Sequence, residues 1–258
     1  MIVLRIYTLL CLMMSVALAV DYLKLESGKA ITVVKSEVAA QQLDEGKAQI
    51  EVYDTTTGIM IGVHDEAIDR EVDRTSHLEL QTALYNIKGQ EVAMVVGVER
   101  KKDNRVLPFG YVRVTCLADI QSGALLCNAE GQAIAFYYVD NSSQEYEGYV
   151  VPVSAAIRAH DDFQKNSSIS RCWVGVIVSS EGTVPEVVSV RPDSPAAKAG
   201  LLKGDILYSV GARQTKTYLE TVDAFYYLIP QEVETFTVLR KGETLSFQVT
   251  PVSRDSLF

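Results

Sequence analysis

The sequence predicts a mostly β protein with few helices, folded as two consecutive domains. Its 258 residues are enough for two modest hydrophobic cores. From about residue 31 to residue 153, short apolar runs rich in Val, Ile and Tyr alternate with polar turns, which is typical of an antiparallel barrel or sandwich. After Ser170 the pattern changes to strands mixed with helical segments, so a second domain is expected there.

The first domain is read from its apolar runs and the turns between them. The turns KKDN, AEGQ and NSSQ are rich in residues that favour reversals of the chain. A short helix is expected from Ser154 to Lys165, with Ser154 as its N-cap. The expected strands include residues 48–52, 91–98, 111–117, 132–139 and 148–153.

The second domain contains the most specific local pattern, SPAAKAGLLKGDIL. Ser194 is placed to cap a short helix, Pro195 to occupy its first position and Gly200 to end it in the left-handed conformation. Residues 219–229 then form an amphipathic helix that ends at Pro230. The runs ETFTVLR and TLSFQVT, separated by a Lys-Gly-Glu turn, predict a closing hairpin.

Composition excludes several classes of protein. Charged residues make up 22% and apolar residues 48% of the chain, which argues against general disorder. The net charge of −9 disfavours nucleic acid as a partner, because phosphate binding needs clustered Lys and Arg. No Cys and His spacing matches a zinc motif, so no metal and no cofactor are expected.

The first 19 residues have the pattern of a secretory signal. Arg5 precedes an apolar run from Ile6 to Val16, and Ala17-Leu18-Ala19 provides a cleavage site after Ala19. The run is shorter than the roughly 20 residues that a membrane-spanning helix needs. We therefore expect an extracytoplasmic protein, periplasmic or secreted, without stable membrane insertion.

Cysteine usage leaves two alternatives for the mature chain. Cys116, Cys127 and Cys172 remain after signal removal, an odd number. Cys116 and Cys127 pair if their strands are neighbours, since an oxidising compartment permits it. Three free thiols is the favoured alternative. Asn141 and Asn166 each begin an Asn-Ser-Ser triplet that fits the N-glycosylation pattern.

The second domain, residues 171–253, resembles a PDZ domain in the circularly permuted form of secreted proteases. The resemblance rests on the element order, on SPAAKAGLLKGDIL and on RCWVGV, which is similar to the carboxylate-binding loop of that family. It implies that backbone N–H groups of this loop hold a peptide's terminal carboxylate while the peptide adds as an extra strand. The alternative is that Trp173 and Val176 are core residues. The implied peptide-binding residues are Trp173, Val174, Gly175, Val176, Val222 and Tyr226.

The stretch QSGALLCNAEGQAIAF, residues 121–136, resembles the nucleophile loop of HtrA-type trypsin-like serine proteases, with Ser122 at the nucleophile position. NIKGQEVAMVVG and GYVVPVSAAI also resemble strands of that family's second barrel. The resemblance implies a remnant or rebuilt first barrel at 20–85 and a second barrel with a linker helix at 86–168. Residues 254–258 would form a tail.

The departures from this family favour a pseudoprotease. Ile120 replaces a glycine of the loop that forms the oxyanion hole, and Gly58 stands where the family has its catalytic Asp. No histidine precedes His64. Surface positions are expected for His64, His77 and His160, among which His160, beside Asp161, is the strongest candidate for a substitute base.

Three functions follow from these observations. The favoured one is an inactive HtrA-like protein that binds C-terminal or unfolded peptides as an adaptor, chaperone or regulator, with an active protease homologue or its own kind as further partners. The second is an active endopeptidase in which Ser122 uses a non-standard base. The third is an assembly protein whose PDZ groove is filled by the chain itself, for which the apolar C-terminal residues are candidates.

Overall fold

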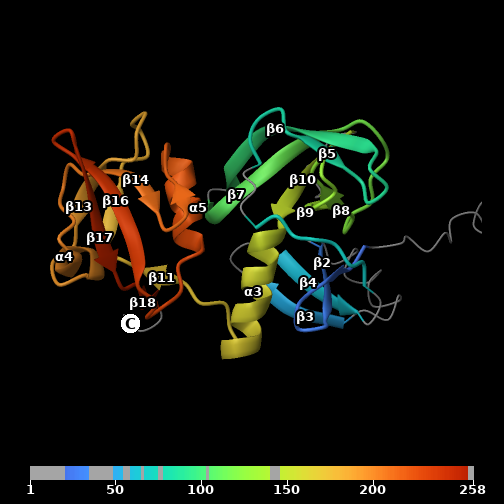
Figure 1. Cartoon of the computed structure of the whole chain (residues 1–258), viewed down its shortest axis with the longest axis horizontal. Coiled ribbons are helices and arrows are strands. Elements are labelled where there is room, and N and C mark those ends of the chain that lie inside the picture. The colour runs from blue at the N-terminus through green and yellow to red at the C-terminus, as the bar shows by residue number, and fades with distance from the viewer. Residues whose placement is uncertain are drawn as a thin grey trace, which may run out of the picture. The chain divides into compact units, whose positions relative to one another are not determined.

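The computed structural model describes residues 21–34, 49–54, 59–64, 67–74, 78–102, 105–139 and 146–254 (Figure 1). The expected signal segment, Gly58, His77, Asn141 and the tail beyond residue 254 lie outside the described residues. The described residues fall into two compact units. One lies within Met1–Tyr53, Ile59–Val95 and Val114–Val153, and the other within Asp54–Gly58, Val96–Arg113 and Ser154–Phe258. The prediction of a mostly β fold is confirmed.

The first unit opens with a four-stranded antiparallel sheet in the order β1-β2-β4-β3. β2 and β4 pair over five residues, from Ala30 opposite His64 to Val34 opposite Met60. Ile31 and Ile61 are fully buried, as expected where alternate residues of a strand face a core. The strands are β1 (Leu23–Lys24), β2 (Ala30–Val34), β3 (Gln49–Asp54) and β4 (Ile59–His64).

A closed antiparallel barrel follows, in the order β10-β7-β6-β5-β8-β9. Every residue of β9 is buried, and Phe136 and Tyr138 are among the largest fully buried side chains. The predicted antiparallel barrel is therefore present. Its strands are β5 (Ala83–Tyr85), β6 (Glu91–Lys102), β7 (Arg105–Cys116), β8 (Leu125–Cys127), β9 (Ala133–Tyr138) and β10 (Glu147–Pro152).

Helix α3 (Val153–Asn166) follows β10 without a connecting loop. It begins one residue before Ser154, so Ser154 lies in the first turn and not at the predicted N-cap position. Its hydroxyl instead lies 2.9 Å from the Tyr227 hydroxyl. A side chain contact outside the helix therefore takes the place of the predicted cap.

The second unit contains the PDZ-like elements. β12 pairs with β13, β11 pairs with β18, and a four-stranded sheet has the order β15-β14-β16-β17. Its strands are β11 (Cys172–Trp173), β12 (Val176–Val178), β13 (Val187–Val190), β14 (Ile206–Val210), β15 (Arg213–Gln214), β16 (Glu234–Arg240), β17 (Glu243–Val249) and β18 (Val252–Ser253). Besides α3, its helices are α4 (Pro195–Ala199) and α5 (Tyr218–Tyr226).

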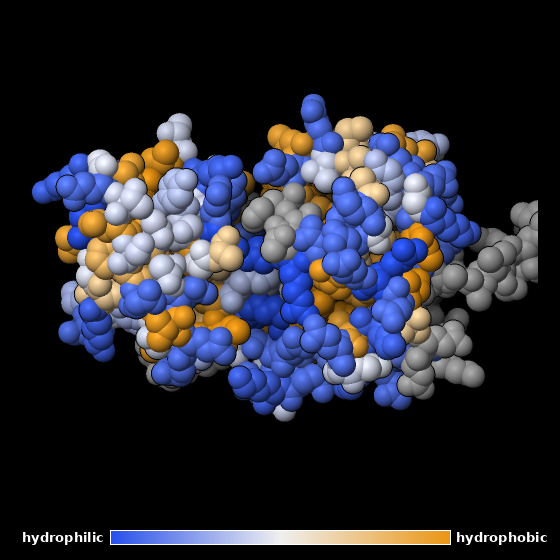
Figure 2. All heavy atoms as spheres, in the orientation of Figure 1, coloured by the Kyte–Doolittle hydropathy of each residue, from blue (hydrophilic) through white to orange (hydrophobic). Residues whose placement is uncertain are grey.

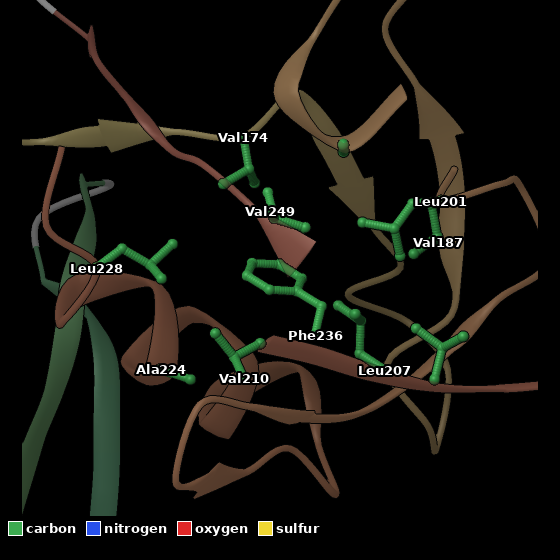
Figure 3. Close-up of a cluster of buried hydrophobic side chains, with 11 residues drawn as sticks. Val174, Val187, Leu201, Leu207, Val210, Ala224, Leu228, Phe236 and Val249 are labelled. Atoms are coloured by element: carbon green, nitrogen blue, oxygen red, sulfur yellow. The ribbon is translucent and has the colours of Figure 1, made fainter. Parts of the chain in front are cut away.

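These elements share one hydrophobic core, which Figure 3 shows around the ring of Phe236. The core joins residues of α4, α5, β13, β14, β16 and β17 with residues of the loops between them. Its buried members are Val174, Val187, Ala196, Leu201, Leu207, Val210, Ala224, Leu228, Phe236, Val238 and Val249.

The caps of α4 are as predicted. The Ser194 hydroxyl accepts a hydrogen bond from the Ala197 N–H at 3.2 Å, Pro195 begins the helix, and Gly200 ends it with φ of 97°. α5 carries a cap that the sequence reading missed. Thr217 and Glu220 form a capping box, in which each side chain accepts from the other's backbone N–H.

The three cysteines of the described residues are free. β7 and β8, which carry Cys116 and Cys127, are not neighbours in the barrel. The Cys116 thiol instead donates to the Tyr137 hydroxyl at 3.4 Å. The favoured alternative of free thiols therefore holds in this structure.

No helix in the described part of the chain is long and apolar enough to cross a membrane. On the face drawn in Figure 2, hydrophobic residues lie in separate patches between hydrophilic ones.

Candidate functional site: the Gly175 loop, the β12 edge and the Ser122 turn

The backbone at Gly175 lies directly against the side chain of Ser194. Gly175 has a φ of 83°, in the left-handed region that favours glycine. A Cβ atom at this position would lie 2.2 Å from the Ser194 Cβ and 2.6 Å from its Oγ. Only glycine therefore fits between Trp173 and the cap of α4.

The carbonyl groups of this loop are engaged within the unit. The Ala196 N–H donates to the Val174 carbonyl at 2.9 Å, and the Arg191 N–H donates to the Gly175 carbonyl at 2.8 Å. The N–H groups of Val174 and Gly175 donate to no backbone acceptor among the described residues. Two adjacent donors thus remain for another acceptor.

β12 offers an unpaired edge next to these donors. Within the described residues it pairs only with β13, through Val176 opposite Val190 and Ile177 opposite Ser189, with a register shift after Ile177. Because the Arg191 N–H reaches the Gly175 carbonyl, Ile177 and Ser189 exchange the next hydrogen bonds, and the N–H and C=O of Val176 point away from β13. Such an edge can receive another strand.

Trp173, Val174 and Val176 have different positions around the loop. Trp173 is half-buried on β11, opposite Val252. Val174 is 5% exposed and belongs to the core, and the partly buried Val176 packs against the same core. The alternative that Val176 is a core residue is therefore supported, and its backbone still faces the open edge.

One face of α5 carries three partly buried side chains at helical spacing, Tyr218, Val222 and Phe225. Phe225 also stacks on Phe236, with 5.8 Å between ring centroids. The sequence reading chose Val222 and missed Tyr218 and Phe225 as site candidates. Counting positions from Val222 in steps of three and four would have found both.

Tyr226 is engaged elsewhere. It is 6% exposed, and its hydroxyl donates to the Ala155 carbonyl at 3.3 Å. The guanidinium carbons of Arg158 and Arg171 lie 4.9 and 5.4 Å from its ring centroid. Tyr226 therefore contacts α3, and Phe225 replaces it as our candidate on α5.

Ser122 lies in a tight turn whose backbone groups are used. The Ala124 N–H donates to the Gln121 carbonyl at 3.0 Å, and Gly123 has a φ of 92°, as in a type II β-turn. The Gly123 N–H donates to the Tyr137 carbonyl at 2.8 Å, and its own carbonyl accepts from Thr32 Oγ1 at 3.1 Å. The turn is thus held from two sides.

The start of the next strand is held by a carboxylate. Asp21 accepts a hydrogen bond from the Leu125 N–H at 3.0 Å. Burial raises the pKa of Asp21, and the hydrogen bond from Leu125 opposes that shift. Ile120 does not adopt a positive φ, so the backbone before Ser122 lacks the conformation that the family's glycine permits.

The Ser122 hydroxyl makes no hydrogen bond with any residue that the structure describes. His64 stacks on Tyr22 with ring centroids 4.8 Å apart. The prediction that His160 lies at the surface is wrong, because other residues cover this position of α3 and leave the side chain 1% exposed. Its Nδ1 lies 3.4 Å from Asp161 Oδ1. The described residues include no cluster of His, Cys, Asp and Glu that could hold a metal ion.

Comparison with known proteins finds a domain match in the second unit and relatives of the chain. Residues 164–250 match the PDZ domain family. Serine endoprotease DegS of Escherichia coli K12 is 27% identical over 149 residues, which are 50% of this chain and 41% of DegS. The probable periplasmic serine endoprotease DegP-like of Brucella suis is 30% identical over 114 residues, 40% of this chain and 22% of that protein. The chain is an HtrA-like protein with a PDZ domain.

A solved structure supports the same fold for the HtrA-like chain. "HtrA-type protease AlgW with tripeptide" has a TM-score of 0.52 and 16% identity, covering 90% of this chain and 88% of that one. At this identity the likeness shows the fold alone. The aligned segments span less than half the length of DegS and of the Brucella relative.

Proposed function

We propose that this HtrA-like protein binds C-terminal or unfolded peptides through its PDZ domain and does not cleave them. The observation that carries the proposal is the open edge of β12 beside the two unengaged N–H donors of Val174 and Gly175. A terminal carboxylate supplies the acceptors that these donors lack, and the peptide backbone pairs with Val176.

The match to the PDZ family supports a peptide lying between this edge and α5, whose side chains favour an apolar peptide end. Val222 and Phe225 present aliphatic and aromatic surface on α5, with no charged group between them on that face. Burying apolar side chains contributes affinity, and the backbone pairing sets the direction of the peptide. The proposed ligand is therefore a peptide with an apolar C-terminal residue and a free carboxylate.

The arrangement at Ser122 supports the absence of cleavage. A serine nucleophile needs a base within hydrogen-bond reach and donors aimed at the oxyanion. The Ser122 hydroxyl makes no hydrogen bond with a described residue, and the Gly123 N–H is used by Tyr137. The catalytic Asp position of the family is Gly58 in this sequence.

We place this function in an extracytoplasmic compartment. The signal-like segment 1–19 supports this placement, as does the periplasmic relative from Brucella suis. The ligand class and the compartment together define the class of partner protein. They are proteins that expose an apolar C-terminus or an unfolded segment there.

Peptide binding is tested with Trp173, the protein's single tryptophan, as the fluorescent reporter. A short peptide with an apolar C-terminal residue is titrated as the free acid and as the amide. Loss of charge-assisted hydrogen bonds should weaken the amide by about 10-fold or more. Equal affinity of the acid and the amide, or no binding of either, would contradict the proposal.

A pair of variants makes this test specific. Val222→Lys puts a charge on the Tyr218–Val222–Phe225 face and should weaken binding. Val233→Lys makes the same change at a 61% exposed position outside α5 and β12, and should bind as the parent protein does. Equal losses in both variants would point to a non-specific effect of charge and against this site.

The absence of cleavage is tested separately. The protein and its Ser122→Ala variant are incubated with an unfolded protein substrate, and fragments are measured over time. We expect no turnover by either form. Cleavage by the parent protein that disappears in the alanine variant would show that Ser122 has a base, and the inactive assignment would then be wrong.

A further inference from the structure

The last turn of α5 is tied to α3 by a cluster of arginine and tyrosine side chains. Arg158 lies at its centre, with a side chain that is 9% exposed. Its guanidinium donates to the Leu228 carbonyl at 3.0 Å and to the Ser170 carbonyl at 3.1 Å, and it pairs with Asp162 at 2.8 Å. One side chain therefore joins α3, the segment that leaves α3 and the end of α5.

Further contacts join α3 to the tyrosines of α5. The Tyr226 hydroxyl donates to the Ala155 carbonyl, and the Tyr227 hydroxyl lies 2.9 Å from Ser154 Oγ. Burial raises the pKa of Tyr226 to about 12, so its hydroxyl remains a neutral donor. The contacts from the first turns of α3 thus reach two successive residues at the end of α5.

The PDZ side of the cluster adds two more contacts to the same turn. The Cys172 thiol donates to the Leu228 carbonyl at 3.1 Å, next to the Arg158 hydrogen bond. The Arg213 guanidinium lies 3.4 Å from the centroid of the Tyr227 ring. Each residue from 226 to 228 is therefore fixed by a contact from outside α5.

This cluster lies directly beside the proposed peptide-binding face. Phe225 precedes Tyr226 in the chain, and Val222 lies one turn earlier. A rotation of α5 that breaks the Tyr226 and Tyr227 contacts also moves the Phe225 ring, because a helix turns as a rigid element. The contacts of α3 thus fix the orientation of the face that receives the peptide.

We propose that α3 is a positioning element of the peptide site, with Arg158 and Ser154 as positioning residues that set peptide affinity by holding the end of α5. The proposal rests on the proposed function. It predicts that changes at Arg158 and Ser154, whose contacts are with Asp162, Ser170 and residues 226–228, alter peptide binding.

The test uses Arg158→Lys, Ser154→Ala and the double variant that combines them, each in the full chain. Arg158→Lys keeps a charge for Asp162 but cannot also reach both carbonyls, and Ser154→Ala removes only the bond to Tyr227. Lys165→Met on the exposed last turn of α3 is the control. Hydrogen exchange of residues 218–228 is measured in the free protein, and the Kd of the free-acid peptide is measured by Trp173 fluorescence.

We expect faster exchange at residues 226–228 and a Kd raised about 5-fold or more in the double variant, the lower end of typical coupling between sites. The control should leave both unchanged. Faster exchange with an unchanged Kd would overturn the proposal, because α3 would then be only structural. Unchanged hydrogen exchange at residues 226–228 would also overturn the proposal about α3, whether or not the parent protein binds peptide. Absence of peptide binding by the parent protein would instead contradict the proposed function.

Discussion

Replacing Gly175 by alanine measures how tightly the loop is built. The positive φ should cost about 1–2 kcal/mol for any residue with a Cβ. The contact of 2.2 Å with the Ser194 Cβ adds overpacking. That overpacking should cost a further 1–3 kcal/mol or so. The expected loss in the free energy of unfolding is therefore about 2–5 kcal/mol, the sum of the two costs.

A second glycine supplies the matched control. Gly204 has a φ of 90°, but a Cβ there would meet nothing within 4 Å. Gly204→Ala should thus cost only the strain of about 1–2 kcal/mol. Urea unfolding followed at Trp173 reports on this unit, because the protein contains one tryptophan. Equal losses for the two variants would refute the reasoning.

A rescue variant separates the two causes of the loss. Ser194→Gly removes the two closest atoms that the new Cβ would meet and leaves Trp173 Cζ2 at 3.1 Å. Glycine is an adequate N-cap that costs only a few tenths of a kcal/mol or so. The double variant with Gly175→Ala should recover most of the overpacking cost. A double variant no more stable than Gly175→Ala alone would show that the contact with Ser194 is not the cause.

Two further predictions concern titratable groups of the PDZ unit. Burial raises the pKa of Asp205, but hydrogen bonds from Arg240 and the Leu202 N–H outweigh it and hold that pKa below its usual value. The stabilisation is therefore complete above about pH 4 and is lost as the pH falls through the lower folded pKa. Asp205→Asn weakens the charge-assisted hydrogen bonds to Arg240, whose side chain is 22% exposed. It should cost about 1.5–3 kcal/mol at pH 7 and flatten the acid limb of urea unfolding. A variant as sensitive to pH as the parent would contradict this. Burial also raises the pKa of the Cys172 thiol from 9.0 to about 11. At pH 8 this thiol should therefore react with a thiol reagent about 100-fold more slowly in the folded protein than in the urea-unfolded protein. Equal reaction rates in the two states would argue against the burial of Cys172.

Local backbone requirements explain why the helix and turns of the PDZ unit could be predicted from the sequence. Ser194, Pro195 and Gly200 each meet a backbone requirement that few residues satisfy, and the structure places them as the cap, first residue and end of α4. Gly175 likewise meets a local requirement, because its positive φ and its contact with Ser194 leave no room for a Cβ. The match of residues 164–250 to the PDZ family agrees with this local reading.

Contacts between residues far apart in the chain explain which features of the fold and of the site could not be predicted from the sequence. The sheet of residues 23–64 has the order β1-β2-β4-β3, and β1 has only two residues, which is too short for a period-two pattern. The misplacement of Tyr226 has a related cause. Helical periodicity marks residues 225 and 226 as apolar positions of α5 but cannot say that α3 covers one of them. His160 was misjudged for the same reason, because its polar neighbours Asp161 and Asp162 suggested a surface position.

The register shift after Ile177 limits what the β12 edge can do. The strand has three residues, and the irregularity interrupts its ladder beyond the second. A strand this short offers few hydrogen bonds to a long intruding segment, and bulged edges discourage sheet-to-sheet growth. The same edge that we propose as the seat of a peptide's last residues is therefore a poor template for the growth of a longer sheet.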